Sequence, residues 1–259
     1  SLYSPGPTRE GISRSMMKGR LSLLVTLLGL PGVVATAWLA VPMLVQGTTL
    51  PVPLQVLQIG AAIQGAVLVV IASILGSFLA PKVDLSAPVL TAALARRDLL
   101  AALRPQLLPG LAGGCVGAAV IIAFHRFVPS SLSFLTDREP LPLVVRVLYG
   151  GITEEILIRW GLMTVITWGV WRLFQRNRPK PSGAIVWAAI GVSAMIFGAS
   201  HVPALAPAMP TLSGVAVAYV TFANAGFGVV AGWLFWRHGL EAAIIAHVLA
   251  HVLAYLLRG

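Results

Sequence analysis

The residues best suited to chemistry are charged side chains set inside long apolar stretches. Glu154 and Glu155 stand together, and Arg159 follows Glu155 by four residues. Residues four apart share a helix face, so we expect Glu155 and Arg159 to form an ion pair. Glu154 is rotated by about 100° and points elsewhere in the bundle, where a carboxylate shielded from water suits a general acid or base. The alternative is one buried network of both carboxylates and Arg159 that only holds helices together.

Three histidines extend this set. His201 ends an apolar stretch, four residues after Phe197, which is also compatible with core packing. His247 and His251 are four apart in the last apolar stretch and share one helix face, the spacing that zinc enzymes use for two ligands. Separate burial would leave Glu154 and three imidazoles unsatisfied in lipid, whereas one wet cavity would satisfy all of them. We therefore expect these groups, from three helices, to line a common cavity.

Composition indicates the surroundings in which this cavity must form. Of the 259 residues, 58% are hydrophobic and 10% are charged, whereas soluble domains are about one quarter charged. A soluble globule is thereby excluded. The net charge of +10 does not indicate nucleic-acid binding, because the basic residues gather in segments expected on one side of a membrane. The sequence predicts an integral membrane protein that has the lipid bilayer, and no nucleic acid, as a partner.

The predicted fold is all-α, a polytopic transmembrane helical bundle of about seven spans plus an interfacial helix. Each span is an apolar stretch of roughly the 20 residues needed to cross the hydrocarbon core. Residues 82–105 carry both acidic and basic side chains and are predicted to form the interfacial helix. Small-residue spacings such as Gly113 and Gly117 favour close helix packing. The predicted spans are residues 21–45, 54–80, 107–127, 142–171, 184–201, 212–236 and 240–257.

The chain is predicted to have two parts, a polar cytoplasmic segment over residues 1–20 and a single transmembrane domain over residues 21–259. Basic residues are concentrated in residues 1–20, 82–105 and 172–182. The positive-inside rule therefore predicts a cytoplasmic N-terminus. The expected location is a bacterial cytoplasmic, or inner, membrane.

The charged motifs resemble those of the CPBP intramembrane proteases, which are related to the type II CAAX prenyl endopeptidases and the bacterial Abi proteins. That family carries EExxxR on one transmembrane helix, FxxxH on a later one, and HxxxN or HxxxD on another. Order and helical placement agree over about residues 142–257. In this sequence the motifs are Glu154-Glu155-x-x-x-Arg159, Phe197-x-x-x-His201 and His247-x-x-x-His251.

The resemblance implies an intramembrane endopeptidase that acts on a membrane-embedded peptide or protein. By likeness to the family, Glu154 and His201 activate water. His247 and His251 occupy the positions that stabilise the oxyanion of the tetrahedral intermediate. The supporting residues implied by the same motifs are Glu155, Arg159 and Phe197.

His251 departs from the family pattern, which has Asn or Asp at this position. A neutral histidine can still donate a hydrogen bond, but His251 also completes a set able to hold Zn²⁺, namely Glu154, His201, His247 and His251. A metalloprotease and a metal-free glutamate mechanism both stay open. So does a catalytically silent CPBP-like subunit that binds a larger membrane-protein complex. An ion-coupled transporter is disfavoured, because the sequence shows no repeated halves.

Overall fold

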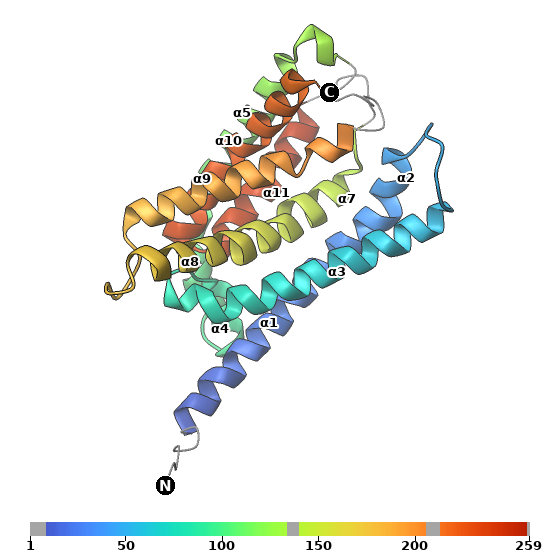
Figure 1. Cartoon of the computed structure of the whole chain (residues 1–259). Coiled ribbons are helices and arrows are strands. Elements are labelled where there is room, and N and C mark those ends of the chain that lie inside the picture. The colour runs from blue at the N-terminus through green and yellow to red at the C-terminus, as the bar shows by residue number, and fades with distance from the viewer. Residues whose placement is uncertain (1–8, 134–139, 206–212, 258–259) are drawn as a thin grey trace.

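The computed structural model describes residues 9–133, 140–205 and 213–257, and all regular structure within these ranges is helical. The long helices lie alongside one another as a bundle (Figure 1). This arrangement confirms the predicted all-α polytopic bundle. The long helices are α1 (Arg9–Ala35), α3 (Leu54–Leu79), α5 (Leu99–Arg126), α9 (Gly183–Ala199), α10 (Gly214–His238) and α11 (Leu240–Leu256).

Shorter segments connect or interrupt the long helices. The short α-helices are α2 (Val41–Leu44), α4 (Pro88–Leu94), α7 (Leu143–Val145) and α8 (Thr164–Phe174). Single turns of 3₁₀-helix are η2 (Ala80–Lys82), η3 (Ser130–Leu132) and η6 (Val202–Leu205). The π-helical segments are η1 (Thr36–Ala40), η4 (Arg146–Thr153) and η5 (Ile156–Met163).

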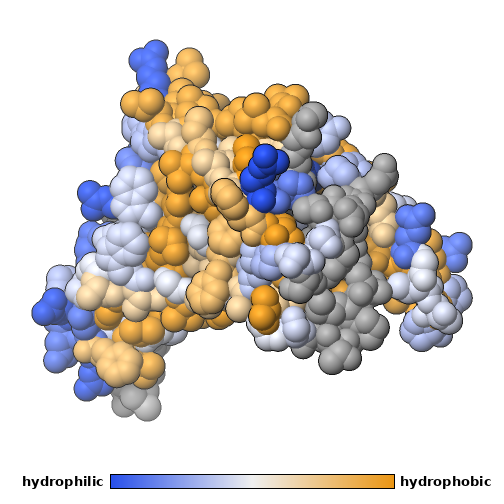
Figure 2. All heavy atoms as spheres, turned by 90° about the horizontal axis from the view of Figure 1, so that it is seen from above, coloured by the Kyte–Doolittle hydropathy of each residue, from blue (hydrophilic) through white to orange (hydrophobic). Residues whose placement is uncertain are grey.

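Five helical stretches of the described chain are long and apolar enough to cross a membrane. A sixth, α11, is apolar but has only 17 residues, and the stretch from α7 to α8 alternates between α- and π-helical turns. Hydrophobic residues form broad areas of the face in Figure 2, with strongly hydrophilic residues at its edges and one such group near its centre. A broad exposed apolar surface of this kind is expected against lipid. The five stretches are Ser15–Leu44, Leu54–Lys82, Leu99–Arg126, Gly183–Leu205 and Gly214–His238.

The prediction of one interfacial helix over residues 82–105 is wrong in its extent. Within it, α4 covers only Pro88–Leu94, and the residues from Leu99 onward already belong to α5. The Asp98 side chain starts α5 by accepting hydrogen bonds from the backbone N–H groups of Leu100 and Ala101, at 2.9 and 3.1 Å. The third span therefore begins before residue 107.

The predicted boundary at residue 20 falls inside α1, which continues from the polar segment into the first span. Residues 1–8 lie outside the described residues. The division into residues 1–20 and 21–259 stays a prediction.

Glycines in α5 allow its close approach to α10 and α11. A Cβ atom at Gly113 would lie 2.5 Å from Leu234, and one at Gly117 would lie 2.6 Å from the Phe227 ring. Real Cβ atoms do not approach so closely, so a larger residue at either position would displace the Leu234 side chain or the Phe227 ring from the observed packing. This confirms the packing role that the small-residue spacing predicts.

A tight turn at Gly239 sets where α11 begins. Gly239 has a φ of +107°, and a Cβ atom there would lie 2.5 Å from Pro88. In the first turn of α11, the Glu241 carboxylate accepts a hydrogen bond from the backbone N–H of Leu90 at 2.9 Å, which fixes α4 against this turn. The start of α11 is therefore held in place, about two helical turns before His247.

Candidate active site

The helical stretch that carries the two acidic residues has an unusual backbone. Glu154 and Glu155 stand between the π-helical segments η4 and η5. The hydroxyl of Thr153 donates to the backbone carbonyl of Gly29 at 2.7 Å and so ties η4 to α1. Because π-helical hydrogen bonds join residues five apart, Tyr149 and Glu154 are brought to the same side. Both side chains line the cavity described below.

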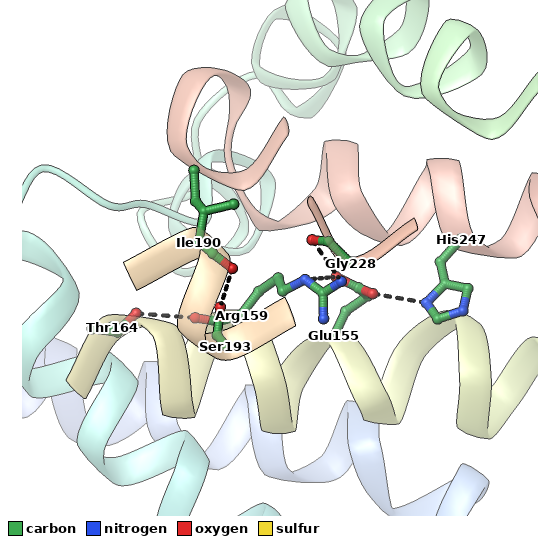
Figure 3. Close-up of polar contacts among 7 residues, drawn as sticks. All are labelled: Glu155, Arg159, Thr164, Ile190, Ser193, Gly228 and His247. Carbon is green, nitrogen blue, oxygen red and sulfur yellow. Dashed lines mark hydrogen bonds and ion pairs between the residues drawn. The ribbon is translucent and has the colours of Figure 1, made fainter. Parts of the chain in front are cut away.

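A buried network centred on Arg159 joins four helical segments (Figure 3). Glu155 and Arg159 are 0% exposed, and Arg159 Nε lies 3.3 Å from Glu155 Oε2. The ion pair predicted from their spacing is confirmed. The guanidinium also donates to the carbonyl of Gly228 in α10 at 3.2 Å and lies 4.9 Å from the ring centroid of Phe197 in α9. We call Glu155, Arg159, Phe197, Gly228 and His247 the Arg159 network.

His247 links this network to α11. Its Nδ1 lies 2.7 Å from Glu155 Oε1, and its side chain is buried. A carboxylate can only accept, so Nδ1 carries the hydrogen and donates it. The ring's other nitrogen, Nε2, points away from Glu155 (Figure 3). The Arg159 network therefore fixes the orientation of the His247 ring through the buried Glu155 carboxylate.

Glu154 and His201 form the second polar pair. His201 Nε2 lies 3.8 Å from Glu154 Oε1, and the two side chains are 31% and 16% exposed. His201 Nδ1 lies 2.9 Å from the backbone carbonyl of Phe197, which can only accept, so Nδ1 carries the hydrogen. A neutral His201 therefore presents the lone pair of Nε2 toward Glu154.

One cavity of about 320 Å³ brings these groups together, and we call it the site cavity. The His247 and His251 rings stack on its wall, with centroids 4.8 Å apart and planes 24° apart. A Cβ atom at Gly150 would lie 2.5 Å from His251 Nε2, so this glycine leaves room for the ring. All four residues predicted to be catalytic line the site cavity, as does Phe197. Glu155 and Arg159 lie behind its wall. The lining residues are Ile121, Leu141, Val145, Arg146, Tyr149, Gly150, Glu154, Phe197, His201, Ala223, Asn224, Phe227, His247 and His251.

Three polar residues of this wall were not singled out as candidates from the sequence: Arg146, Tyr149 and Asn224. A signal was present for each, because a guanidinium, a phenol or an amide inside an apolar span is costly unless it faces a cavity or a partner. The sequence does not show toward which side of the bundle each of these side chains points. In the case of Tyr149 it depends on the π-helical turns of η4.

A second, apolar cavity of about 450 Å³ adjoins the site cavity. The two share Tyr149, Glu154 and Phe197 as lining residues. The remaining wall of the apolar cavity comes mainly from aliphatic side chains of α3 and η5, such as Leu68 and Leu157. Glu154 therefore lies on the wall that the two cavities share.

The four residues predicted as a zinc set are not arranged as zinc ligands. Zinc in proteins is held by ligand atoms that converge at about 2.0–2.1 Å, usually in a tetrahedron. The nearly parallel rings of His247 and His251 place their in-plane lone pairs side by side, so these lone pairs do not converge on one point. Among the described residues, no three His, Cys, Asp or Glu side chains are grouped to hold a metal ion.

Fold and site together define an integral membrane protein whose helices form a cavity with charged and polar side chains on its wall. The sequence model of the type II CAAX prenyl endopeptidase Rce1-like family matches residues 137–253. The matched segment holds all three charged motifs, and the match agrees with the resemblance drawn from them. The family supports a function of the intramembrane protease kind. No curated protein and no solved structure matches the chain.

Proposed function

We propose that this protein is an intramembrane endopeptidase that hydrolyses a peptide bond with water activated by Glu154 and His201. The observation that carries the proposal is the pairing of these two side chains, 3.8 Å apart, in the cavity where His247 and His251 stack. The match of residues 137–253 to the Rce1-like family model supports the same kind of activity. The proposed substrate is a membrane-embedded peptide or protein.

The separation of Glu154 and His201 suits a bridging water molecule. At 3.8 Å the two atoms are too far apart for a direct hydrogen bond, but one water molecule can contact both. An ionised Glu154 and the Nε2 lone pair of a neutral His201 both accept, so the water donates its two hydrogens to them. Its oxygen lone pair is then free to face a substrate carbonyl carbon.

Hydrolysis needs a base, an oxyanion partner and an acid. As the water oxygen bonds to the carbonyl carbon, Glu154 takes one of its protons, and the carbonyl oxygen becomes the oxyanion. The proton held by Glu154 then passes to the amide nitrogen as the C–N bond breaks. The products are one new carboxyl group and one new amino group, and Glu154 returns to its starting form.

In this proposal His247 and His251 stabilise the oxyanion. His251 can donate from a ring N–H in either neutral tautomer. When His247 is protonated, its Nε2–H is a second donor, with Glu155 as the counter-ion 2.7 Å away. Preorganised donors in a site shielded from water are worth several kcal/mol in such reactions, about 2.7–4 kcal/mol for one donor.

The direct test is Glu154→Gln, which keeps the shape of the side chain and removes the base. The purified protein is reconstituted in phosphatidylcholine vesicles and offered a set of internally quenched fluorescent peptides with apolar segments. We expect about a 10²- to 10⁴-fold lower cleavage rate, with thermal stability retained. Full activity of this variant would defeat the proposal.

A matched control is Asp84→Asn, the same change from acid to amide. Asp84 is half exposed and pairs with Lys180 outside the site cavity. Its cleavage rate should equal that of the unchanged protein.

His251 favours a second candidate function, a catalytically silent subunit of a membrane-protein complex. The family has Asn or Asp at this position, and the two histidine rings stack instead of standing apart. This candidate predicts stoichiometric co-purification with other membrane proteins and no cleavage of any peptide in the set. Cleavage that depends on Glu154 would exclude it.

We further propose a bacterial cytoplasmic membrane with the N-terminus on the cytoplasmic side. The connection between α8 and α9 contains Arg176, Arg178 and Lys180, a concentration of basic residues expected on that side. A reporter fused before α1 that is active only in the cytoplasm tests this orientation.

A further inference from the structure

Asn224 is a polar residue on the α10 wall of the site cavity. It is half-buried and lies among apolar neighbours such as Ile121 and Phe227. It also lines a smaller cavity of about 170 Å³, together with His125 and Tyr219, toward the C-terminal end of α5. Asn224 therefore lies on the wall of both cavities, on the side of α10. An amide inside a membrane-crossing helix is costly unless it has a polar partner.

The hydrogen-bonding capacity of the Asn224 amide is largely unused within the described chain. A side-chain amide has two N–H donors and a carbonyl oxygen. The Nδ2 group donates to the backbone carbonyl of Val220, one turn earlier, at 2.8 Å. Because that carbonyl can only accept, the NH₂ group must face it, which fixes the orientation of the amide. One N–H and the carbonyl oxygen remain available to a molecule in the cavity.

A peptide group has the hydrogen-bonding complement that this amide needs. Each backbone peptide group offers one N–H and one carbonyl, and leaving either unpaired among apolar side chains costs free energy. Phe227 lies three residues after Asn224 in α10, and its ring centroid is 4.5 Å from that of His247. Asn224, Glu154 and His247 all line the same cavity of about 320 Å³. A peptide whose scissile bond lies at Glu154 can therefore place a neighbouring peptide group at Asn224.

We propose that Asn224 is a substrate-binding residue that hydrogen-bonds a backbone peptide group adjacent to the scissile bond. The assignment rests on the proposed endopeptidase function. It gives Asn224 a role in holding the substrate, whereas Glu154 and His201 act on the water. Such binding is equal in the ground state and the transition state, so its loss raises KM and changes kcat little.

Kinetics of Asn224→Leu test the assignment. Leucine keeps the approximate size and removes the hydrogen-bonding groups. With the quenched peptide that the unchanged protein cleaves fastest, we expect about a tenfold higher KM and a similar kcat, the effect of one lost hydrogen bond. Phe222→Leu is the control in the same helix, because Phe222 is 58% exposed on the outer surface, and it should leave both constants unchanged.

Ester analogues of the same peptide separate a hydrogen bond from a packing effect. Two analogues are made. In each of them an ester oxygen replaces the N–H of one of the two peptide groups that flank the scissile bond. For one of the two analogues, the unchanged protein should lose about tenfold in kcat/KM, while Asn224→Leu should lose nothing further. If both proteins respond alike to both analogues, Asn224 does not bind a flanking peptide group.

A binding measurement keeps this inference separate from the proposed function. Glu154→Gln and the double variant Glu154→Gln with Asn224→Leu are compared for affinity toward the same peptide by fluorescence anisotropy. Weaker binding of the double variant, by about tenfold, supports the assignment whether or not Glu154 proves to be the base. Equal binding by the two proteins overturns it. Retained cleavage by Glu154→Gln would instead count against the proposed function.

Discussion

Glu154 and Glu155 are consecutive residues with opposite surroundings. Glu155 is fully buried and holds both Arg159, at 3.3 Å, and His247, at 2.7 Å. Glu154 keeps 16% of its side chain exposed, lines the site cavity and faces His201 across 3.8 Å. A carboxylate whose oxygens bind fixed cations or hydrogen-bond donors has a structural role. A carboxylate that faces a cavity can react with a molecule in that cavity. Chemically identical side chains are thus given different tasks by their environments.

This contrast predicts that Glu155→Gln damages stability where Glu154→Gln does not. Removing one partner of a buried ion pair leaves the other charge uncompensated, which costs about 3–5 kcal/mol. Chemical unfolding in detergent should therefore show a large loss of stability for Glu155→Gln and for Arg159→Met. Cleavage by Glu155→Gln should fall as well, because His247 loses the carboxylate that it binds. Equal stability of the two Glu→Gln variants would remove the distinction between the residues.

A double replacement sharpens the same comparison. Glu155→Gln combined with Arg159→Met removes both charges, so neither is left buried alone. Its unfolding free energy should lie closer to that of the unchanged protein than either single variant does. A loss equal to the sum of the two single losses would show that the two side chains are not coupled.

A smaller effect is expected at the cavity wall near His251. In Gly150→Ala, the new Cβ atom would lie 2.5 Å from His251 Nε2 and displace the ring. We expect a 10- to 100-fold lower kcat, because small misplacements in a site carry costs of about this size. The control is Gly169→Ala in α8, where an added Cβ atom meets no atom within 4 Å. An unchanged kcat in Gly150→Ala would mean that the position of His251 is unimportant for cleavage.

The smallest expected effect is that of metal removal. Because the rings of His247 and His251 stack and do not converge, cleavage should be unchanged after dialysis against EDTA or addition of 1,10-phenanthroline. The measurement is the initial cleavage rate before and after treatment. Loss of activity that Zn²⁺ restores would contradict the metal-free mechanism and would support His251 as a zinc ligand.

Composition and spacing alone sufficed for the membrane class and most helix positions. The predicted span 54–80 corresponds to α3, and the predicted span 240–257 corresponds to α11. These agreements have a simple cause, since an apolar stretch in lipid must satisfy its own backbone hydrogen bonds and therefore forms a helix. The start of α5 at Leu99 was not predicted from the apolar pattern, because it depends on the N-terminal cap formed by Asp98.

The acidic and histidine residues of the site were also accessible from the sequence, because an ionisable group in an apolar span needs a polar partner or a cavity. The structure brings Glu154, His201, His247 and His251 to one cavity. Their catalytic roles stay a prediction that the variants above test. The spacing of Glu155 and Arg159 correctly indicated their ion pair.

Which partner each group takes was decided only by the packed bundle. The sequence predicts that His247 lines a cavity with Glu154, His201 and His251, but it does not predict that His247 Nδ1 binds Glu155, 92 residues away in the chain. The stacking of His251, the π-helical placement of Tyr149 and the direction of Asn224 likewise have no local sequence signature. Partner choice inside lipid depends on how helices distant in the chain approach one another. That approach is set by small residues such as Gly117 and Gly150, whose effect exists only once the helices are packed.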